Sequence, residues 1–261
     1  MPRVPKLLII DSNALLHRAF HALPPLISKN GEPTGAVYGF LLTLFRAIKD
    51  LGPNYMVACF DTPVPTFRHK QFKEYKATRP PTPVEIKSQI STTKEVLEAF
   101  DIPVFIKEGF EADDLIATIA TLAGNQNKDI KIYILTGDLD TLQLVSDRVN
   151  IYTLGRGIKD TVIYDREKVI ERLEITPEQV VDFKSLTGDP SDNIPGVHGI
   201  GKKTAADLLN KFGTLEKIYS VIDDKNVNIK ERTRGLLSED RKKAFTAKSL
   251  VQVKKDVDVD F

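Results

Sequence analysis

Cysteine is almost absent from this sequence, since Cys59 is the only one among the 261 residues. It lies inside the apolar run MVACF, residues 56–60, so we expect a small buried core residue there. A single cysteine excludes a disulfide within the chain. The chain therefore suits a reducing compartment, and we expect a cytoplasmic protein.

Long apolar runs are absent as well. No run approaches the roughly 18 residues that a membrane-spanning helix needs. The stretch MPRVPKLLIID, residues 1–11, lacks the apolar segment and cleavage site of a secretion signal. With 28% charged and 41% hydrophobic residues, the composition is typical of a soluble globular protein. We expect no membrane association, and the length fits one domain or a domain with an added module.

Short apolar runs alternate with stretches of helical periodicity over the first 165 residues. Strands are predicted at residues 6–10, 56–60, 102–106 and 131–135. Helices are predicted at residues 14–23, 35–51 and 83–100, and after residue 110. Two β-rich segments around Gly155 and Gly157 predict an edge hairpin. This alternation predicts an α/β fold with a mostly parallel central sheet flanked by helices. The pattern then turns helical, so we place a domain boundary near Asp165.

Acidic residues follow three of the predicted strands. Asp11 follows KLLII, Asp61 follows MVACF, and Asp138 follows IYILTG with Asp140 two residues later. Because ligands of open parallel sheets bind beyond the carboxyl ends of the strands, we expect these side chains to line one bowl. Cysteine and histidine are nearly absent from these motifs, which disfavours zinc and iron. Several hard oxygen ligands favour Mg²⁺ or Mn²⁺.

The stretch GFEADD, Gly109 to Asp114, adds three acids at the start of a predicted helix. Residues three apart share a helix face, so Glu111 and Asp114 point roughly one way and Asp113 stands beside them. Acids in a first turn can simply complement the helix dipole and cap free N–H groups. Three packed acids, however, repel each other unless a positive charge lies among them. The stretch alone leaves capping and metal binding open, and the strand-end acids favour the metal.

Residues 62–82 are strongly basic, although the net charge of the whole chain is only +1. The basic residues are Arg68, His69, Lys70, Lys73, Lys76 and Arg79. Interleaved aromatic residues and flanking prolines make this a candidate nucleic-acid surface, because cations neutralise phosphates and rings stack on bases. A solvated surface loop is the alternative. The adjacent acidic bowl would repel a polyanion without nearby cations, which favours the nucleic-acid interpretation. Arg18 and His21 could face the same bowl or a phosphate.

A glycine-rich turn from Gly196 to Gly201 leads into a helix that begins near Lys202. Turn glycines let the backbone approach a partner, and N–H groups at a helix start favour phosphate. A short turn of this kind could equally be a helix connector. The longer stretch GVHGIGKKTAADLL is more specific, because it matches a helix–hairpin–helix element that grips a DNA backbone without reading its sequence.

Taken together, these motifs resemble the 5′ nuclease family. Within that family the sequence is most similar to the 5′→3′ exonuclease domain at the N-terminus of bacterial DNA polymerase I. Phage 5′ nucleases and flap endonucleases are more distant relatives. The shared motifs cover nearly the whole chain in the family order: LLIIDSNALLHRAF, FDTPVPTFRH, YKATRPPTP, GFEADDLIATIA, LTGDLDTLQLV, GDPSDNIPGVHGIGKKTAADLL and VDVDF.

The resemblance implies a PIN-like nuclease domain at residues 1–165, with a helical arch at about 63–90. It also implies a C-terminal helical region at residues 166–261, which carries the helix–hairpin–helix motif at about 185–212. Two metal ions, Mg²⁺ or Mn²⁺, would occupy the active site. The residues implied around one ion are Asp11, Asp61, Glu111 and Asp113. Those around the other are Asp138, Asp140 and Asp192, with Asp114 and Asp189 as supporting acids.

The resemblance also assigns contacts with the substrate. Lys76 and Arg79 match residues that contact the scissile phosphate from the arch, and they join the first acid set as candidate catalytic residues. Arg68 and Tyr75 match positions that bind or stack on the substrate. The backbone carbonyls of the turn at residues 196–201 match a K⁺ site. The expected DNA contacts are Arg18, Arg68, Lys70, Tyr75, Lys76, Arg79, Gly196, Gly199, Ile200, Gly201, Lys202 and Lys203.

The implied activity is that of a structure-specific 5′→3′ exonuclease or flap endonuclease that uses two-metal-ion catalysis. Its substrates would be DNA with a 5′ flap, nick or 5′ end, and RNA–DNA primer junctions in replication and repair. We expect a monomer, with a polymerase domain in cis or in trans, located in the cytoplasm and at the nucleoid of a bacterial-type cell.

Other classes of protein remain possible at this level. A non-catalytic branched-DNA-binding module would use the acids as structural or regulatory groups, and it would show no Mg²⁺-dependent cleavage. A PIN-like ribonuclease carries fewer acids and generally lacks the GVHGIGKKTA stretch. A HAD-type phosphatase needs a D-x-D pair after the first strand, where this chain has Asp11-Ser12-Asn13.

Overall fold

The computed structural model describes residues 4–155 and 160–261. The chain divides into two compact units that are each described by themselves. Unit 1 comprises Met1–Thr66, Pro81–Asp165 and Lys254–Phe261. Unit 2 comprises Phe67–Pro80 and Arg166–Val253. Each unit is therefore assembled from segments that are far apart in the sequence.

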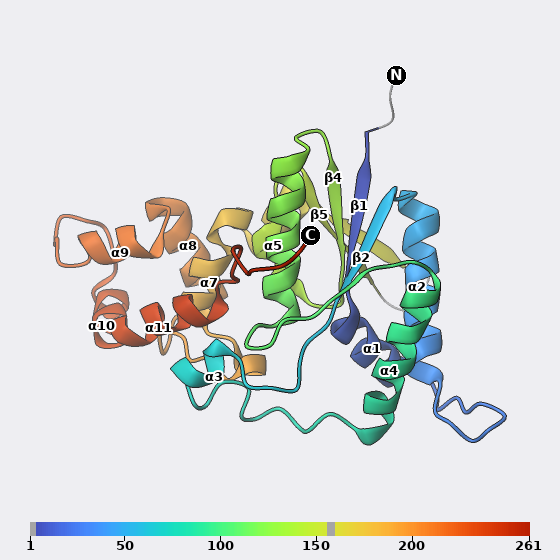
Figure 1. The fold of residues 1–261 in the computed structure, drawn as a ribbon. Coiled ribbons are helices and arrows are strands. Elements are labelled where there is room, and N and C mark those ends of the chain that lie inside the picture. The colour runs from blue at the N-terminus through green and yellow to red at the C-terminus, as the bar shows by residue number, and fades with distance from the viewer. Residues whose placement is uncertain (1–3, 156–159) are drawn as a thin grey trace. The chain divides into compact units, whose positions relative to one another are not determined.

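Unit 1 is built on a six-stranded sheet, within the described residues, of order β3-β2-β1-β4-β5-β6 (Figure 1). Its strands are β1 (Lys6–Asp11), β2 (Tyr55–Cys59), β3 (Val104–Phe105), β4 (Lys131–Leu135), β5 (Val149–Leu154) and β6 (Thr161–Tyr164). All neighbouring strands pair in parallel except β5 and β6, which are antiparallel. The predicted mostly parallel α/β sheet is thus confirmed. Gly157, which we placed in the edge hairpin, lies outside the described residues.

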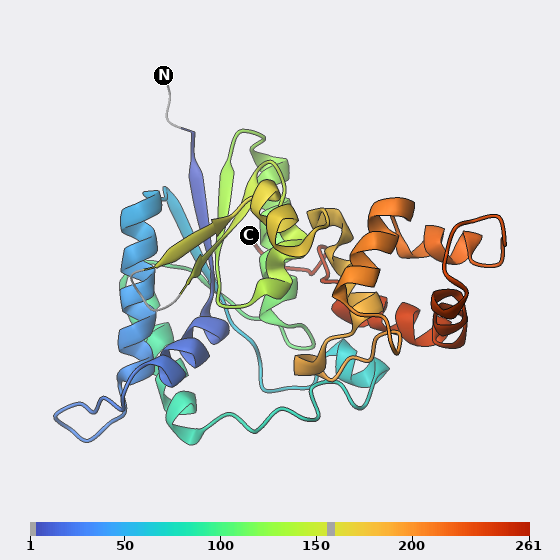
Figure 2. The same cartoon turned by 180° about the vertical axis from the view of Figure 1, so that it is seen from behind.

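Helices cover both faces of this sheet (Figures 1 and 2). On one side lie α1 (Ser12–Ala22), α2 (Gly35–Leu51) and α4 (Val84–Ala99), and on the other lies α5 (Ala112–Gln126). Side chains alternate along a strand, so Leu8 and Ile10 of β1 join the core on the side of α1, α2 and α4. Apolar residues on successive helical turns, including Phe40 and Leu44, complete that core.

Unit 2 is helical. Its helices are α3 (Phe67–Gln71), α6 (Arg166–Leu173), α7 (Val180–Thr187), α8 (Lys202–Phe212), α9 (Leu215–Val221), α10 (Glu231–Glu239) and α11 (Arg241–Val251). Short 3-10 turns lie at Pro177–Gln179 and Pro190–Asp192. Helix α7 packs against α11 and α8. A small apolar cluster joins Tyr75 of the basic stretch to Ile194 and to Leu250 of α11.

The segment expected to form a helical arch, residues 63–90, differs from that expectation. Only Phe67–Gln71 and the first residues of α4 are helical, and turns occupy most of residues 72–79. Residues 67–80 belong to unit 2, whereas 63–66 and 81–90 belong to unit 1. Arg68, within α3, and Tyr75, in the turns that follow, are both buried.

The end of the described chain returns to unit 1 after the helices of unit 2. There the backbone N–H of Lys254 donates to Asp114 Oδ1 at 2.8 Å, and that of Val257 donates to Thr118 Oγ1 at 3.2 Å. Both acceptors lie on α5. Among the described residues, no helix combines the length and apolar character needed to cross a membrane.

Candidate active site

The first two predicted acids sit at the carboxyl ends of β1 and β2. Asp11 ends β1 and caps α1, where its Oδ1 accepts from the Ala14 N–H at 3.2 Å. Its Oδ2 accepts from the Thr136 hydroxyl at 2.6 Å. Asp61 lies two residues beyond β2, and its Oδ1 accepts from the Ala112 N–H at 2.7 Å. Its own N–H donates to Asn13 Oδ1 at 3.1 Å. Both acids are therefore fixed by the starts of neighbouring helices.

The three acids of GFEADD divide into two roles. Glu111 and Asp114 form a capping box at the start of α5, and Asp114 Oδ2 accepts from the Glu111 N–H at 3.1 Å. Asp114 is fully buried, and its Oδ1 accepts from the Lys254 N–H. Each of its two oxygens thus accepts a hydrogen bond from a backbone N–H group. Asp113 is half-buried and stands among the strand-end acids.

Asp138 and Asp140 lie on the turn after β4, where the 3-10 helix η1 (Leu139–Leu144) begins. Asp138 caps that helix, because its Oδ1 accepts from the Asp140 N–H at 2.9 Å. The Asp138 N–H in turn donates to the Thr136 hydroxyl at 2.9 Å. These bonds orient the Asp138 carboxylate and fix the Asp140 backbone at the same edge of the sheet as Asp11.

The pKa shifts of these acids show that they lie close together. Burial raises the pKa of the Asp11 carboxyl to about 7, and the charges of Asp61 and Asp138 add to the rise, while hydrogen bonds from Thr136 and Ala14 oppose it. Burial also raises the pKa of Asp113 well above its ordinary value, and the charges of Asp11, Asp138, Asp140 and Asp61 raise it further. Carboxylates that repel one another in this way are stabilised by a bound cation. Five of the predicted acids are brought together in unit 1.

Cys59 lies beside this cluster without being a candidate ligand. Its thiol is buried, as predicted, and its pKa is raised by that burial and by the charges of Asp11, Asp113 and Asp61. A thiol held in its neutral form is a poor metal ligand. The donors that remain are carboxylate oxygens, which suit Mg²⁺ or Mn²⁺.

Two further predicted acids lie in unit 2. Asp189 caps a 3-10 turn, where it accepts from the Ser191 N–H at 3.0 Å and from the Ser191 hydroxyl at 2.6 Å. Its Oδ2 also pairs with Lys184 Nζ at 2.8 Å. Asp192 is buried and meets three groups of the basic stretch. They are the Tyr75 hydroxyl at 3.1 Å, Lys76 Nζ at 3.9 Å and the Arg79 guanidinium.

The basic stretch is held mainly by unit 2 itself. Arg68 is only 2% exposed, and it donates to the carbonyls of Leu250 at 2.8 Å and Gln252 at 3.2 Å. Tyr75 is 3% exposed. In this conformation neither side chain presents a surface to DNA, in contrast to our expectation, because both fill the interior beside α11. Lys70 and Arg79 are exposed and Lys76 is half-buried.

Arg18 is committed to the backbone of unit 1. Its guanidinium donates to the carbonyls of Leu154 and Gly155, both at 2.7 Å. It therefore secures the end of β5, and in this conformation it is occupied by carbonyls rather than directed at a phosphate. His21 is exposed at the end of α1.

The glycine-rich turn connects the end of α7 to α8 in unit 2. A Cβ on Gly196 would overlap the backbone of Leu186 to Gly188, so the two chain segments approach more closely than any other residue permits. Gly199 has a φ of 78°, and Gly201 precedes α8. The turn lines a hollow of about 560 Å³ together with Lys243. Ile200 is buried, whereas Lys202 and Lys203 are exposed.

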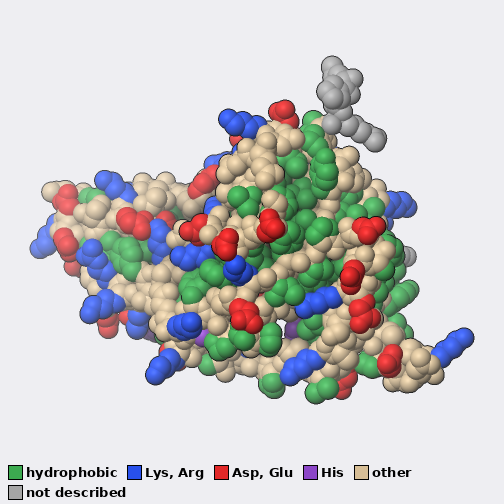
Figure 3. Space-filling view, in the orientation of Figure 1, with side chains coloured by type: hydrophobic (Ala, Val, Ile, Leu, Met, Phe, Trp, Pro, Cys, Tyr) green, Lys and Arg blue, Asp and Glu red, His purple; other side chains and the backbone are tan. Residues whose placement is uncertain are grey.

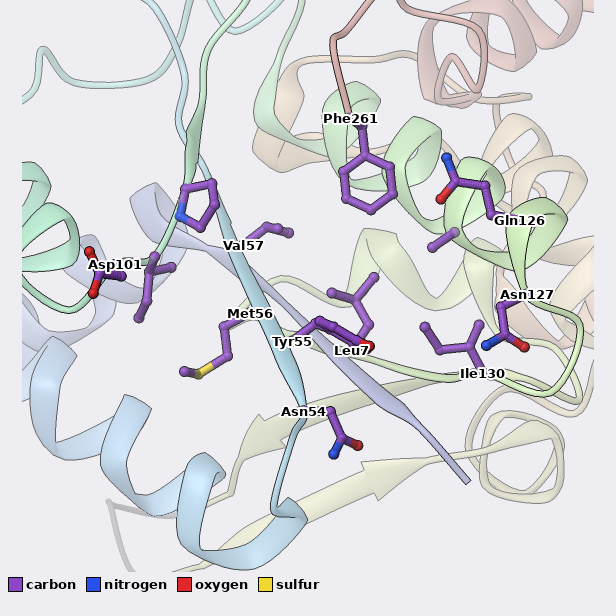
Figure 4. Close-up of a pocket in the computed structure, with 13 residues that line it drawn as sticks. Leu7, Asn54, Tyr55, Met56, Val57, Asp101, Gln126, Asn127, Ile130 and Phe261 are labelled. Atoms are coloured by element: carbon purple, nitrogen blue, oxygen red, sulfur yellow. The ribbon is translucent and has the colours of Figure 1, made fainter. Parts of the chain in front are cut away.

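A larger hollow, of about 640 Å³, lies away from all the predicted acids (Figure 4). Leu7, Asn54 and Tyr55 line it at the start of β1 and β2, with Ile130 and Phe261. In a parallel sheet this is the end opposite to the strand-end acids. On the face shown in Figure 3, Lys and Arg side chains are interspersed with acids.

Four positioning residues were missed by sequence reasoning. Asn13 and Thr136 contact Asp61 and Asp11, and Lys184 pairs with Asp189. Asp240 accepts from the His198 N–H at 2.8 Å and pairs with Lys243, which steadies the glycine-rich turn. Asn13 and Thr136 do lie inside the motifs DSN and TGDLD, so their position next to an acid was the available signal.

Comparison with known proteins identifies the family. Residues 6–174 match the family described as 5′-3′ exonuclease, N-terminal resolvase-like domain, and residues 175–261 match 5′-3′ exonuclease, C-terminal SAM fold. A DNA polymerase I from Bacillus caldotenax is 41% identical over 256 residues, which are 98% of this chain and 28% of that protein. The chain thus spans about a quarter of the length of this curated relative.

Solved structures share the fold. T5 5′-exonuclease with bound zinc has a TM-score of 0.73 at 24% identity, covering 94% of this chain and 89% of that chain. The catalytic core of Rad2 in complex with a DNA substrate has a TM-score of 0.60 at 19% identity, covering 97% of this chain and 82% of that chain. With both parts of the family matched in order over residues 6–261, the chain belongs to the 5′-3′ exonuclease family.

Proposed function

We propose that this chain is a metal-dependent, structure-specific 5′ nuclease that hydrolyses phosphodiester bonds near the 5′ end of duplex or flapped DNA. The observation that carries the proposal is the carboxylate cluster of unit 1. Asp113 lies close enough to Asp11, Asp61, Asp138 and Asp140 for their charges to raise its pKa. Membership of the 5′-3′ exonuclease family supports this reaction. The carboxylate cluster would hold the metal ions that the reaction requires.

The acid cluster fits divalent metal ions, because its donors are carboxylate oxygens that repel one another. We assign Asp11, Asp61, Glu111 and Asp113 to one ion, and Asp138, Asp140 and Asp192 to a second, with Asp114 and Asp189 in support. When bound, two Mg²⁺ or Mn²⁺ ions supply an activated water and neutralise charge on the leaving oxygen. Hydrogen bonds to helix starts hold the acids for this role.

The basic stretch would meet the substrate phosphate. Lys76 and Arg79 pair with Asp192 in this structure, and each has further N–H donors with which it could contact a phosphate. We propose that their charge stabilises the scissile phosphate as negative charge develops on it. Asp192 would be the residue of this group that holds the second ion.

Residues 185–212 would hold the duplex. The backbone of the turn at residues 196–201 is accessible around a hollow, and the exposed Lys202 and Lys203 follow it. Backbone N–H groups and lysines of this kind bind phosphates without reading sequence. We propose a K⁺ ion at the carbonyls of this turn. We also propose residues 1–165 as the nuclease domain and 166–261 as the DNA-binding region.

The wider role is drawn from the relatives. Proteins named DNA polymerase I contain the matched region, so we propose action on 5′ flaps, nicks and RNA–DNA primer junctions, with a polymerase domain in cis or in trans. We propose that the protein acts as a monomer at the nucleoid, in the cytoplasm of a bacterial-type cell.

Single-turnover cleavage of a 5′-labelled double-flap DNA tests the proposal, with Mg²⁺ and with EDTA. Wild type should release a short 5′ product only with the metal. Asp113→Asn should lower the rate by orders of magnitude while duplex affinity largely survives, because it removes one ligand charge. Asp129→Asn, at an exposed loop position, is the matched control and should cleave like wild type.

The competing function is a branched-DNA-binding module. It would bind the flap tightly with no cleavage under any divalent metal, and the carboxylate cluster would then need another explanation. Near-normal cleavage by Asp113→Asn would instead retain the nuclease and refute the assignment of its metal site.

A further inference from the structure

Thr136 occupies the junction between β4 and the turn that carries Asp138 and Asp140. The residue is completely buried. Its backbone N–H donates to the Tyr152 carbonyl at 3.2 Å, which extends the pairing of β4 with β5 by one residue. The backbone of Thr136 is therefore fixed by the sheet, and its side chain starts from a rigid point.

The hydroxyl of Thr136 makes two hydrogen bonds of defined direction. A backbone N–H can only donate, so the hydroxyl must accept from the Asp138 N–H at 2.9 Å. Its single hydrogen then remains for Asp11 Oδ2, which lies at 2.6 Å. One hydroxyl thus joins the acid at the end of β1 to the turn after β4.

These bonds leave room for a metal ion on the same carboxylate. Each oxygen of Asp11 accepts one hydrogen bond, from Ala14 or Thr136, and a carboxylate offers about four lone-pair sites. Thr136 therefore orients Asp11 without saturating it. The same hydroxyl fixes the position of the Asp138 backbone N–H. The Asp138 carboxylate in turn accepts from the Asp140 N–H at 2.9 Å.

We propose that Thr136 is a positioning residue for divalent-metal binding, whose hydroxyl sets the spacing between Asp11 and the Asp138–Asp140 turn. The inference rests on the proposed function and deepens it, because it links the acids assigned to one ion with those assigned to the other. Hydrogen-bond partners of metal ligands commonly change metal affinity by about 10- to 100-fold when they are removed.

Thr136→Val tests this role, because valine has the shape of threonine but no hydroxyl. Thr136→Ser keeps the hydroxyl. Thr43→Val is the matched control, since Thr43 is also buried and donates to the Gly39 carbonyl at 2.9 Å within α2. The first readout is the Mg²⁺ concentration that gives half-maximal single-turnover cleavage. The second is the rise in Tm caused by Mg²⁺, which does not depend on activity.

We expect Thr136→Val to need at least about tenfold more Mg²⁺ and to show a smaller Mg²⁺-induced rise in Tm. Thr136→Ser should stay within about threefold of wild type, and Thr43→Val should lose stability without a change in Mg²⁺ dependence. If Thr136→Val does not fold, Thr136→Ala replaces it with the same expected shift, because alanine avoids the added methyl group beside the Asp11 carboxylate.

The inference is overturned if Thr136→Val loses only stability, as Thr43→Val should, and keeps the wild-type response to Mg²⁺. It is also overturned if Thr136→Ser fails to restore that response. Should wild type be stabilised by Mg²⁺ but cleave no DNA, the proposed function fails, while the Tm comparison still decides the role of Thr136.

Discussion

At the scale of single residues, aspartate performs several tasks in this chain. Asp114 is buried without strain because two backbone N–H groups satisfy it. Asp113, one residue earlier, faces four other acids and has a raised pKa. Asp182 is buried beside Lys248, with 2.7 Å between Oδ1 and Nζ. Capping therefore accounts for Glu111 and Asp114, and the proposed metal site falls to Asp113 beside the strand-end acids.

The raised pKa values of Asp11 and Asp113 predict how stability depends on pH. From about pH 4 to pH 7 Asp11 of the folded, metal-free protein holds a proton that the unfolded chain has released, and the raised pKa of Asp113 acts in the same direction. Raising the pH across this window should therefore lower the free energy of unfolding. Mg²⁺ should oppose the loss at pH 7, because an ion at the proposed site would bind the charged carboxylates. Thermal unfolding in EDTA and in Mg²⁺ measures both effects.

Asp113→Asn provides the control for this pH effect. Asparagine has no proton to take up on folding and carries no charge, so the metal-free variant should be more stable than wild type near pH 7 and should lose less stability as the pH rises. Mg²⁺ should also stabilise it less. Equal pH profiles for variant and wild type would contradict the crowded carboxylate cluster.

At the scale of elements, the glycine-rich turn depends on the contact between two glycines. Gly188 has a φ of 75°, and a Cβ there would lie 2.6 Å from the Gly196 backbone nitrogen. The Val197 N–H donates to the Leu186 carbonyl at 2.9 Å, which binds the turn to the end of α7. The turn is therefore held by backbone packing, and glycine is required at both positions for lack of space.

Gly196→Ala should destabilise the protein by about 3 kcal/mol or more, because the new methyl group overlaps backbone atoms that cannot move independently. Gly201→Ala is the matched control, since nothing lies within 4 Å of its added Cβ. Urea unfolding followed by circular dichroism measures both. A Gly196→Ala protein as stable as Gly201→Ala would show that the two segments are not in contact.

At the scale of the whole molecule, compact units do not follow the order of the chain. Residues 67–80 belong to unit 2 although their neighbours on both sides belong to unit 1. Lys254–Phe261 returns to unit 1 after the last helix of unit 2. Val257 of this segment is buried. The Lys254 N–H donates to Asp114, and the Val257 N–H donates to Thr118.

A chain that stops after Val253 should therefore be less stable by about 3 kcal/mol. It loses the burial of Val257 and leaves the buried Asp114 carboxylate without one N–H partner. A chain that stops after Asp258 keeps both interactions and is the control. Equal urea midpoints for the two shortened chains would refute a stabilising role for residues 254–257.

The sequence by itself determined the elements and the acids at their ends. Apolar runs and helical periodicity are local signals, and they placed β1, β2 and β4 with Asp11, Asp61 and Asp138 just beyond them. The mostly parallel sheet follows from the alternation of these elements. A strand followed by an acid can be recognised from neighbouring residues alone, without information about distant parts of the chain.

Only the tertiary structure decided which partner each polar side chain has. Arg68 was predicted to bind DNA from its charge, yet it is buried against the carbonyl of Leu250, which is 182 residues away in the sequence. The sequence did not predict a role for Thr136, because its hydrogen bond depends on Asp11, which lies at the end of the neighbouring strand. Burial and hydrogen bonding join residues that are distant in the chain, and local patterns of charge and hydrophobicity carry no record of such pairs.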